Sequence, residues 1–150
     1  MNIILLGYNG FLGSYILENL HQKLAESYNF KIICIGRNIR NKPFINKKIR
    51  YEKWNFVNFS NLKLSFFKKK NILINCIGKN YSNSKNLKEI NLIFIQKIVN
   101  YLNDNRILAH LIHLSSVSVY DVEKKNLCKV RNITENSKIK FTNFYSESKL

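Results

Sequence analysis

The feature that most constrains the fold of this chain is a glycine-rich turn between a short apolar run and an amphipathic segment. Residues 2–6 read NIILL, and such a continuous apolar run predicts a strand that is buried on both faces. Residues 7–13 follow as GxxGxxG, with a glycine at every third position. An apolar residue then recurs every four positions from Leu12 to Leu24, which predicts a helix with one apolar face. This order predicts the first half of a parallel βαβ unit.

The remaining apolar runs alternate between strand and helix patterns. Strands are predicted at residues 30–35, 49–54, 71–77 and 107–114, and helices at residues 62–67, at residues 87–102 and from Phe141 onward. This alternation predicts a parallel sheet with helices on both faces. Right-handed crossovers then give the strand order 3-2-1-4-5 of a Rossmann-like, doubly wound α/β fold.

Length and charge limit the classes of protein to consider. A chain of 150 residues, 45% of them hydrophobic, is long enough for one domain and too short for two. The net charge of +16 admits a nucleic-acid or anionic-membrane partner. The basic residues, however, are scattered between apolar segments, and no zinc-finger, RNP-type or basic-zipper pattern accompanies them. We therefore favour a generally lysine-rich composition over nucleic-acid binding.

The cysteines and histidines give no sign of a disulfide framework or a metal site. Cys34, Cys76 and Cys128 are far apart and odd in number, which favours reduced thiols in a cytoplasmic protein. His110 and His113 are predicted to point to opposite faces of one strand, so a shared metal ion is not expected. No signal-peptide pattern precedes the first strand, and no apolar stretch is long enough to cross a bilayer.

The glycine turn is typical of a dinucleotide-binding site. Glycines let the chain turn tightly, and they let backbone N–H groups approach a pyrophosphate at the N-terminus of the following helix. An ordinary glycine-rich turn is the alternative, and the strand–turn–helix context favours the cofactor. Arg37 stands at the end of the second predicted strand, where a carboxylate would bind the ribose of NAD. Arginine can instead pair with the 2′-phosphate of NADP, which favours NADP over NAD; otherwise Arg37 is a surface residue that stacks on adenine or has no role.

Two short motifs in the second half carry residues suited to chemistry. Residues 115–120, which follow the fifth predicted strand, read SSVSVY. Tyr145 and Lys149 form a YxxxK pair, and this spacing places both side chains on one face of a helix. The same spacing starts at Tyr81 and at Tyr120. Only Tyr145 follows the serine-bearing strand by a suitable interval and opens a predicted helix.

In this order the three motifs resemble the extended short-chain dehydrogenase/reductase family (NAD-dependent epimerase/dehydratase family) over essentially the whole chain. The resemblance implies that the catalytic residues are Ser116, Tyr145 and Lys149. It implies that the cofactor is bound by Gly7, Asn9, Gly10, Phe11, Leu12, Gly13, Arg37, Asn55, Cys76, Gly78, Asn91, Tyr145 and Lys149. Asn55 replaces an aspartate that is common in the family, and Asp121 replaces the glycine after the serine element, so both places depart from the family pattern.

The resemblance also implies a reaction type. Hydride would move to or from nicotinamide while Tyr145 exchanges a proton with a substrate hydroxyl or carbonyl. Lys149 would stabilise the tyrosine phenolate and hold the nicotinamide ribose, and Ser116 would hydrogen-bond the reacting oxygen. Residues 116–118 contain no acid for eliminating water, which favours an epimerase or ketoreductase over a 4,6-dehydratase. A non-catalytic NADP-binding sensor or scaffold is the alternative, although such relatives often lose the tyrosine.

The family places substrate specificity in a part that follows the YxxxK helix, whereas this sequence ends at Leu150. We therefore expect residues 1–150 to form an incomplete NAD(P)-binding Rossmann domain, truncated before the last sheet strands and without the substrate-binding part. It would be a fragment or one part of a split protein. A sugar nucleotide as substrate comes from the resemblance alone, and assembly into a homodimer is left open.

Overall fold

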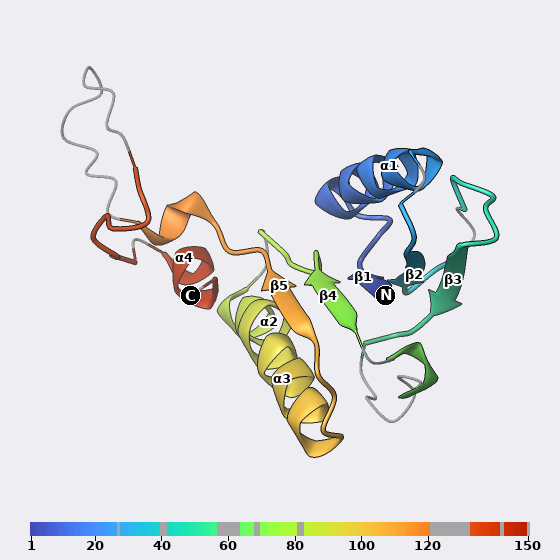
Figure 1. The fold of residues 1–150 in the computed structure, drawn as a ribbon. Helices are drawn as coiled ribbons and strands as arrows, with labels where there is room; N and C mark the ends of the chain where they lie inside the picture. The colour runs from blue at the N-terminus through green and yellow to red at the C-terminus, as the bar shows by residue number, and fades with distance from the viewer. Residues whose placement is uncertain are drawn as a thin grey trace. The chain divides into compact units, whose positions relative to one another are not determined.

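A computed structural model describes most of the chain (Figure 1), which divides into two compact units. The first unit comprises residues 1–77 and 96–114, and the second comprises residues 78–95 and 115–150. The described residues are 1–26, 28–39, 42–56, 64–67, 70–80, 83–120, 133–141 and 143–149.

The first unit is built on a parallel sheet that confirms the predicted order. Its strands are β1 (Asn2–Leu6), β2 (Lys31–Gly36), β3 (Ile49–Lys53), β4 (Asn71–Asn75) and β5 (His110–His113). They lie side by side in the order β3-β2-β1-β4-β5, and every neighbouring pair is parallel. All five residues of β1 are buried, as the continuous apolar run predicted.

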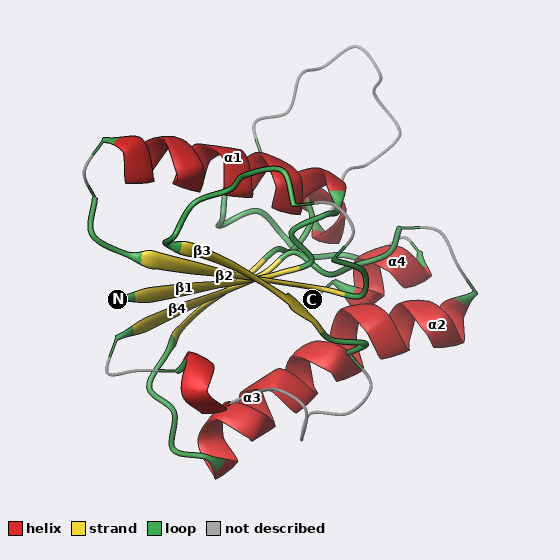
Figure 2. Ribbon diagram, turned by 90° about the vertical axis from the view of Figure 1, so that its right-hand side faces the viewer, coloured by secondary structure: helices red, strands yellow, loops and turns green. Residues whose placement is uncertain are grey.

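Helices cover both faces of this sheet. Figure 2 shows α1 (Phe11–Ala25) on one face and α3 (Phe94–Asp104) on the other. Because side chains alternate along a strand, Ile3 and Leu5 of β1 face one way, and they belong to the buried cluster that contains Leu17 of α1. A 3₁₀ turn, η2 (Leu64–Phe66), lies where a short helix was predicted.

Helix α1 confirms the predicted segment and most of its apolar face, because Ile16 and Leu20 pack against the core cluster that contains Leu17 and Leu24. Its buried residues are Gly13, Leu17 and Leu24, whereas Leu12 is half exposed. A spacing of four residues turns about 40° further than one full helical turn, so Leu12 and Leu24 stand about 120° apart around the axis. Residues that recur every four positions therefore move gradually around the helix, and Leu12 lies outside the face that contacts the core.

The segments predicted to bind the cofactor in this unit lie at the carboxyl edge of the sheet. Leu6 at the end of β1 pairs with Ile35 in β2 and with Asn75 in β4, so the residues after these strands leave the sheet at one edge. The strand order reverses direction between β1 and β4. In open α/β sheets, ligands bind at this switch point, outside the carboxyl ends of the strands.

Strand β5 is shorter than predicted. The predicted run covered residues 107–114, but only residues 110–113 pair with β4. The carbonyl of Leu108 instead accepts a hydrogen bond from the Asn71 side chain at 3.0 Å. This side-chain hydrogen bond replaces a further backbone hydrogen bond between β4 and β5.

The second unit contains the short helices α2 (Ser84–Lys88), η4 (Val117–Val119, 3₁₀) and α4 (Phe144–Ser148). The helix predicted over residues 87–102 is not α-helical throughout. A π-helical segment, η3 (Glu89–Ile93), lies between α2 and α3. Such segments place one extra residue in a helical turn and are frequent at functional sites.

In the described residues, no helix has both the length and the apolar character that crossing a membrane requires.

Cys34 lies in the middle of β2 and is fully buried, and burial raises the pKa of its thiol to about 12. Only about one thiol in ten thousand is then ionised at pH 8, and the thiolate is the reactive form. We expect iodoacetamide to label the partly buried Cys76 well before Cys34 in the folded chain. Peptide mass mapping over time measures this. Labelling in guanidinium, where both should react alike, is the control, and equal rates in the folded chain would contradict the prediction.

Candidate functional site

The glycine turn is fixed to the neighbouring strand by its backbone. The Gly7 N–H donates to the Ile35 carbonyl at 2.8 Å, and the Gly10 N–H donates back to the Gly7 carbonyl at 3.0 Å. Gly7 has a φ of +77°, a left-handed conformation that favours glycine. The chain therefore reverses within three residues at the end of β1.

Gly13 lets helix α1 pack directly on this turn. A Cβ at Gly13 would lie 2.8 Å from the carbonyl carbon of Gly7 and 2.9 Å from the Cα of Tyr8. These neighbours are backbone atoms and cannot move aside cheaply. The position therefore admits no side chain, which is the requirement that a GxxGxxG turn imposes.

The N-terminus of α1 is open to a ligand. Its N-cap is Gly10, and no side chain in the described part of the chain caps the first amide groups. These N–H groups lack partners within the helix, and the helix dipole favours negative charge there. Beside them, Phe11 is almost fully exposed and Leu12 is half exposed. The turn can thus hold a phosphate or pyrophosphate.

The other cofactor residues predicted in the first unit lie beyond the strand ends. Arg37 is exposed just after β2, and Asn55 is exposed two residues after β3. Cys76 is partly buried after β4, where its N–H donates to the Leu6 carbonyl at 3.0 Å. Asn9 is exposed, and its side chain donates to the backbone carbonyl of Asn38 at 3.3 Å.

In the second unit the ammonium of Lys149 lies against Gly78. A Cβ at Gly78 would be 2.7 Å from Lys149 Nζ and 3.3 Å from the amide oxygen of Asn91. Lys149 is only 8% exposed, although lysine is rarely buried. The missing side chain at residue 78 therefore leaves the space that the Lys149 head group occupies.

Asn91 is buried in the π-helical segment, and its amide makes three bonds inside the protein. Its oxygen accepts from the Lys79 N–H at 2.9 Å. Its nitrogen donates to the Lys79 carbonyl and to the Ser148 hydroxyl, both at 2.9 Å. Asn91 thus fastens the turn after Gly78 to α4. The sequence analysis predicted Asn91 as a cofactor-binding residue, and in this structure its side chain bonds to protein groups.

Ser116 has a neighbour that the sequence analysis did not identify. Its hydroxyl oxygen accepts from the Ser118 N–H at 3.2 Å and from the Ser118 hydroxyl at 2.9 Å. A hydroxyl oxygen has two lone pairs, so its acceptor capacity is used and its own hydrogen remains to donate. The Ser-x-Ser spacing was the available signal for Ser118. The adjacent Ser115 hydroxyl donates to the Lys149 carbonyl at 2.8 Å.

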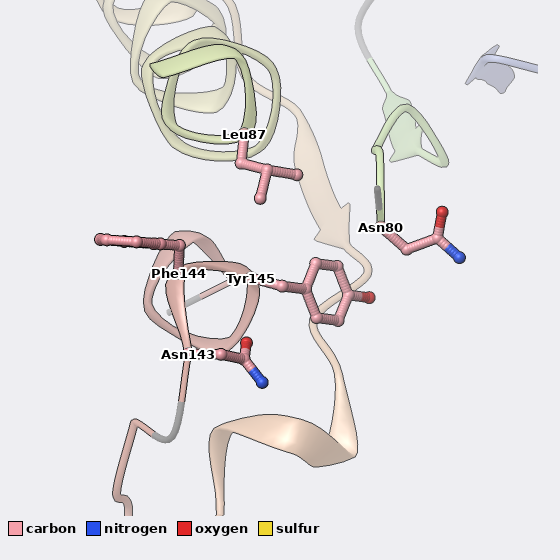
Figure 3. Close-up of a pocket in the computed structure, with 5 residues that line it drawn as sticks. All are labelled: Asn80, Leu87, Asn143, Phe144 and Tyr145. Atoms are coloured by element: carbon pink, nitrogen blue, oxygen red, sulfur yellow. The ribbon is translucent and has the colours of Figure 1, made fainter. Parts of the chain in front are cut away.

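Tyr145 lines a pocket of about 530 Å³ with Asn80, Leu87, Asn143 and Phe144. In Figure 3 the tyrosine hydroxyl points away from α4. The Asn143 side chain accepts from the Ser146 N–H at 2.9 Å in a capping box that starts α4. The pocket combines apolar walls with amide groups beside a phenol, which suits a polar substrate that carries hydroxyl groups.

The structure thus distributes the predicted residues between the two units. The second unit holds Gly78, Asn91, Ser116, Tyr145 and Lys149, and the first holds the others, from Gly7 to Cys76. Three residues from the sequence analysis, Tyr81, Asp121 and Cys128, lie outside the described residues, as does Lys124, the partner of Tyr120 in one of the competing YxxxK pairs.

Three solved structures of similar fold are named as enzymes of nucleotide sugars. UDP-N-acetylglucosamine 4-epimerase from Methanobrevibacter ruminantium M1, in complex with UDP-N-acetylmuramic acid, is 18% identical with a TM-score of 0.72, over 99% of this chain and 46% of that one. UDP-glucuronic acid 4-epimerase from Bacillus cereus, in complex with NAD, is 17% identical with a TM-score of 0.71, over 99% and 49%. A hypothetical dTDP-4-dehydrorhamnose reductase from Sulfolobus tokodaii is 22% identical with a TM-score of 0.66, over 99% and 49%. The chain spans about half the length of these proteins.

None of the curated proteins matches the sequence significantly. The family model of the NAD dependent epimerase/dehydratase family matches residues 3–150, which is nearly the whole chain. Together with the sheet order and the glycine turn, this match shows that the chain belongs to the NAD-dependent epimerase/dehydratase family.

Proposed function

We propose that this chain is part of an NAD(P)-dependent oxidoreductase or epimerase that acts on a hydroxyl or keto group of a sugar nucleotide. The observation that carries the proposal is the setting of Tyr145 within the second unit. Its ring lines a pocket, and Lys149, four residues later, is buried with its ammonium against Gly78. A phenol and an ammonium one helical turn apart, in a chain of this family, support acid–base chemistry at a substrate oxygen.

The glycine turn fits the pyrophosphate of a nicotinamide dinucleotide. Its backbone is tight enough that residue 13 admits no Cβ, and the uncapped amides of α1 follow directly. We assign Gly7, Gly10 and Gly13 to this role. When bound, the nicotinamide ring supplies a hydride acceptor or donor.

The side chains of the second unit have distinct tasks in this proposal. Tyr145 gives a proton to the substrate carbonyl or takes one from its hydroxyl. We assign Lys149, whose ammonium lies against Gly78, to holding the nicotinamide ribose. Ser116, whose acceptor sites are taken by Ser118, donates its remaining hydrogen to the reacting oxygen. Asn91 keeps the turn after Gly78 in place.

The substrate class is proposed from the relatives and from the pocket. The solved structures of similar fold include enzymes named for UDP-glucuronic acid and UDP-N-acetylglucosamine. Asn80 and Asn143 offer amide groups for sugar hydroxyls, and Phe144 offers an exposed aromatic face. Residues 116–118 carry no carboxylate, so we favour epimerase or ketoreductase chemistry over 4,6-dehydration.

We further propose a preference for NADP, because Arg37 is exposed just after β2. Replacing Arg37 by alanine should weaken NADPH binding by about 10-fold or more and change NADH binding little, since a charge-assisted hydrogen bond contributes about 1.5–3 kcal/mol. Fluorescence titration with both cofactors measures this. Lys31→Ala, which removes a charge from the other end of β2, is the matched control. Equal affinity of the unaltered chain for NADH and NADPH would contradict the preference.

Activity is tested by incubating the protein with UDP- and dTDP-sugars in the presence of each oxidised or reduced cofactor. The proposal predicts a change of sugar configuration, or of oxidation state, detected by NMR and mass spectrometry. Cofactor binding without conversion of any sugar nucleotide would instead favour the non-catalytic sensor or scaffold.

A further inference from the structure

Tyr8 occupies an unusual place for the second residue of a glycine turn. It is only 1% exposed and belongs to the main core cluster of the first unit. Its ring lies 5.3 Å from the ring of Tyr51, at an angle of 60°. A turn residue facing a ligand would be exposed, so Tyr8 serves the protein interior.

The Tyr8 ring supports the end of β2. A Cβ at Gly36 would lie 2.9 Å from Tyr8 Cε1 and 3.3 Å from the side-chain oxygen of Asn9. Only glycine therefore lets the backbone of β2 settle on the tyrosine ring. The residue that follows this contact is Arg37.

The polar ends of Tyr8 and Asn9 hold the loop after β2. The Tyr8 hydroxyl and the Asn9 amide both donate to the carbonyl of Asn38, each at 3.3 Å. Burial raises the pKa of the Tyr8 phenol above its usual value, which itself lies well above neutral pH, and the hydroxyl therefore keeps its proton. Arg37 thus lies between Gly36, which packs on the Tyr8 ring, and Asn38, whose carbonyl accepts two hydrogen bonds. The Arg37 side chain itself is exposed.

We infer that Tyr8 is a positioning residue for recognition of the adenosine 2′-phosphate, acting through the backbone that carries Arg37. This inference rests on the NADP preference proposed above. The Tyr8 hydroxyl restricts the segment from Gly36 to Asn38, so that the guanidinium is presented in one place. A ligand without the 2′-phosphate does not use the guanidinium, so Tyr8 acts on selectivity more than on general affinity.

The matched probes are adenosine 2′,5′-bisphosphate and 5′-AMP, which differ only in the 2′-phosphate. Tyr8→Phe keeps the buried ring and removes the hydroxyl. We expect it to weaken binding of the bisphosphate by about 3- to 10-fold, the range of one lost hydrogen bond, and to change binding of 5′-AMP by less than about 2-fold. Calorimetric titration gives both dissociation constants.

A double-mutant cycle tests whether Tyr8 acts by positioning Arg37 or by a contact of its own with the 2′-phosphate. In the Arg37→Ala background, Tyr8→Phe should have no further effect on the ratio of the two dissociation constants, because the group it positions is gone. Tyr51→Phe is the matched control. It removes the hydroxyl of the adjacent ring, which bonds to the backbone of Phe44, and should leave the ratio unchanged.

Each other outcome overturns a defined part of the account. If Arg37→Ala changes the ratio and Tyr8→Phe does not, the role of Tyr8 is wrong while the NADP preference stands. If Tyr8→Phe weakens both probes equally, its role is only structural, and the inference fails. If Tyr8→Phe does not fold, Asn9→Ala removes the second donor to Asn38 from an exposed position and should shift the ratio in the same direction. If the unaltered chain binds neither probe, the proposed function itself fails.

Discussion

Replacing Tyr145 by phenylalanine is expected to lower turnover of the responsive sugar nucleotide by about 10²–10⁴-fold, the usual contribution of general acid–base catalysis. The phenyl ring still lines the pocket beside Asn80 and Leu87, so substrate should still bind. The loss should therefore appear in kcat, with KM nearly unchanged. Initial rates over a range of substrate concentration, with cofactor titration alongside, measure both.

Tyr120→Phe is the matched control for this substitution. Tyr120 also begins a YxxxK sequence and directly follows η4, so it shares the local pattern of Tyr145. We expect Tyr120→Phe to retain most of the activity. If Tyr145→Phe stays within about 2-fold of the unaltered protein, or if Tyr120→Phe shows the larger loss, the assignment of the acid–base residue is wrong.

Replacing Gly13 by alanine is expected to damage both the fold of the first unit and cofactor binding. The added Cβ would meet the backbone of Gly7 and Tyr8 at under 3 Å, so either the turn or α1 must shift. Overpacking of this kind costs about 1–3 kcal/mol of unfolding free energy. Because the displaced backbone is the proposed pyrophosphate site, cofactor affinity should fall as well. Urea unfolding and cofactor titration measure the two effects.

Gly10→Ala tests whether the effect depends on this contact rather than on any alanine in the turn. Within the part of the chain that the structure describes, a Cβ at Gly10 would meet only the Gly7 carbonyl oxygen, at 3.3 Å, which requires a much smaller adjustment. We expect Gly10→Ala to lose less than half the unfolding free energy that Gly13→Ala loses. Equal losses would mean that the close packing of α1 on the turn does not govern stability.

The sequence predicted the sheet order and the glycine turn because both depend on local patterns. A continuous apolar run such as residues 2–6 suits a strand covered on both faces, and a strand–helix alternation allows few topologies. The family match over residues 3–150 agrees with the resemblance that the motif order suggested.

Features that depend on tertiary partners could not be predicted in this way. The π-helical segment contains Asn91, whose side chain bonds to Lys79 and to Ser148, a residue far along the chain. Apolar periodicity does not report such polar contacts. Likewise, the position of Tyr8 in the glycine turn predicts an exposed residue. Its burial depends on the packing of its ring against Gly36, which the local sequence does not show.

The most direct test of the central claim is a titration of the chain with NADPH, followed by the fluorescence of the bound nicotinamide. The account predicts saturable binding of one cofactor per chain, which Gly13→Ala weakens and Tyr145→Phe retains. Absence of saturable binding of both NADPH and NADH to the folded chain would contradict the account, because the glycine turn would then not be a dinucleotide site.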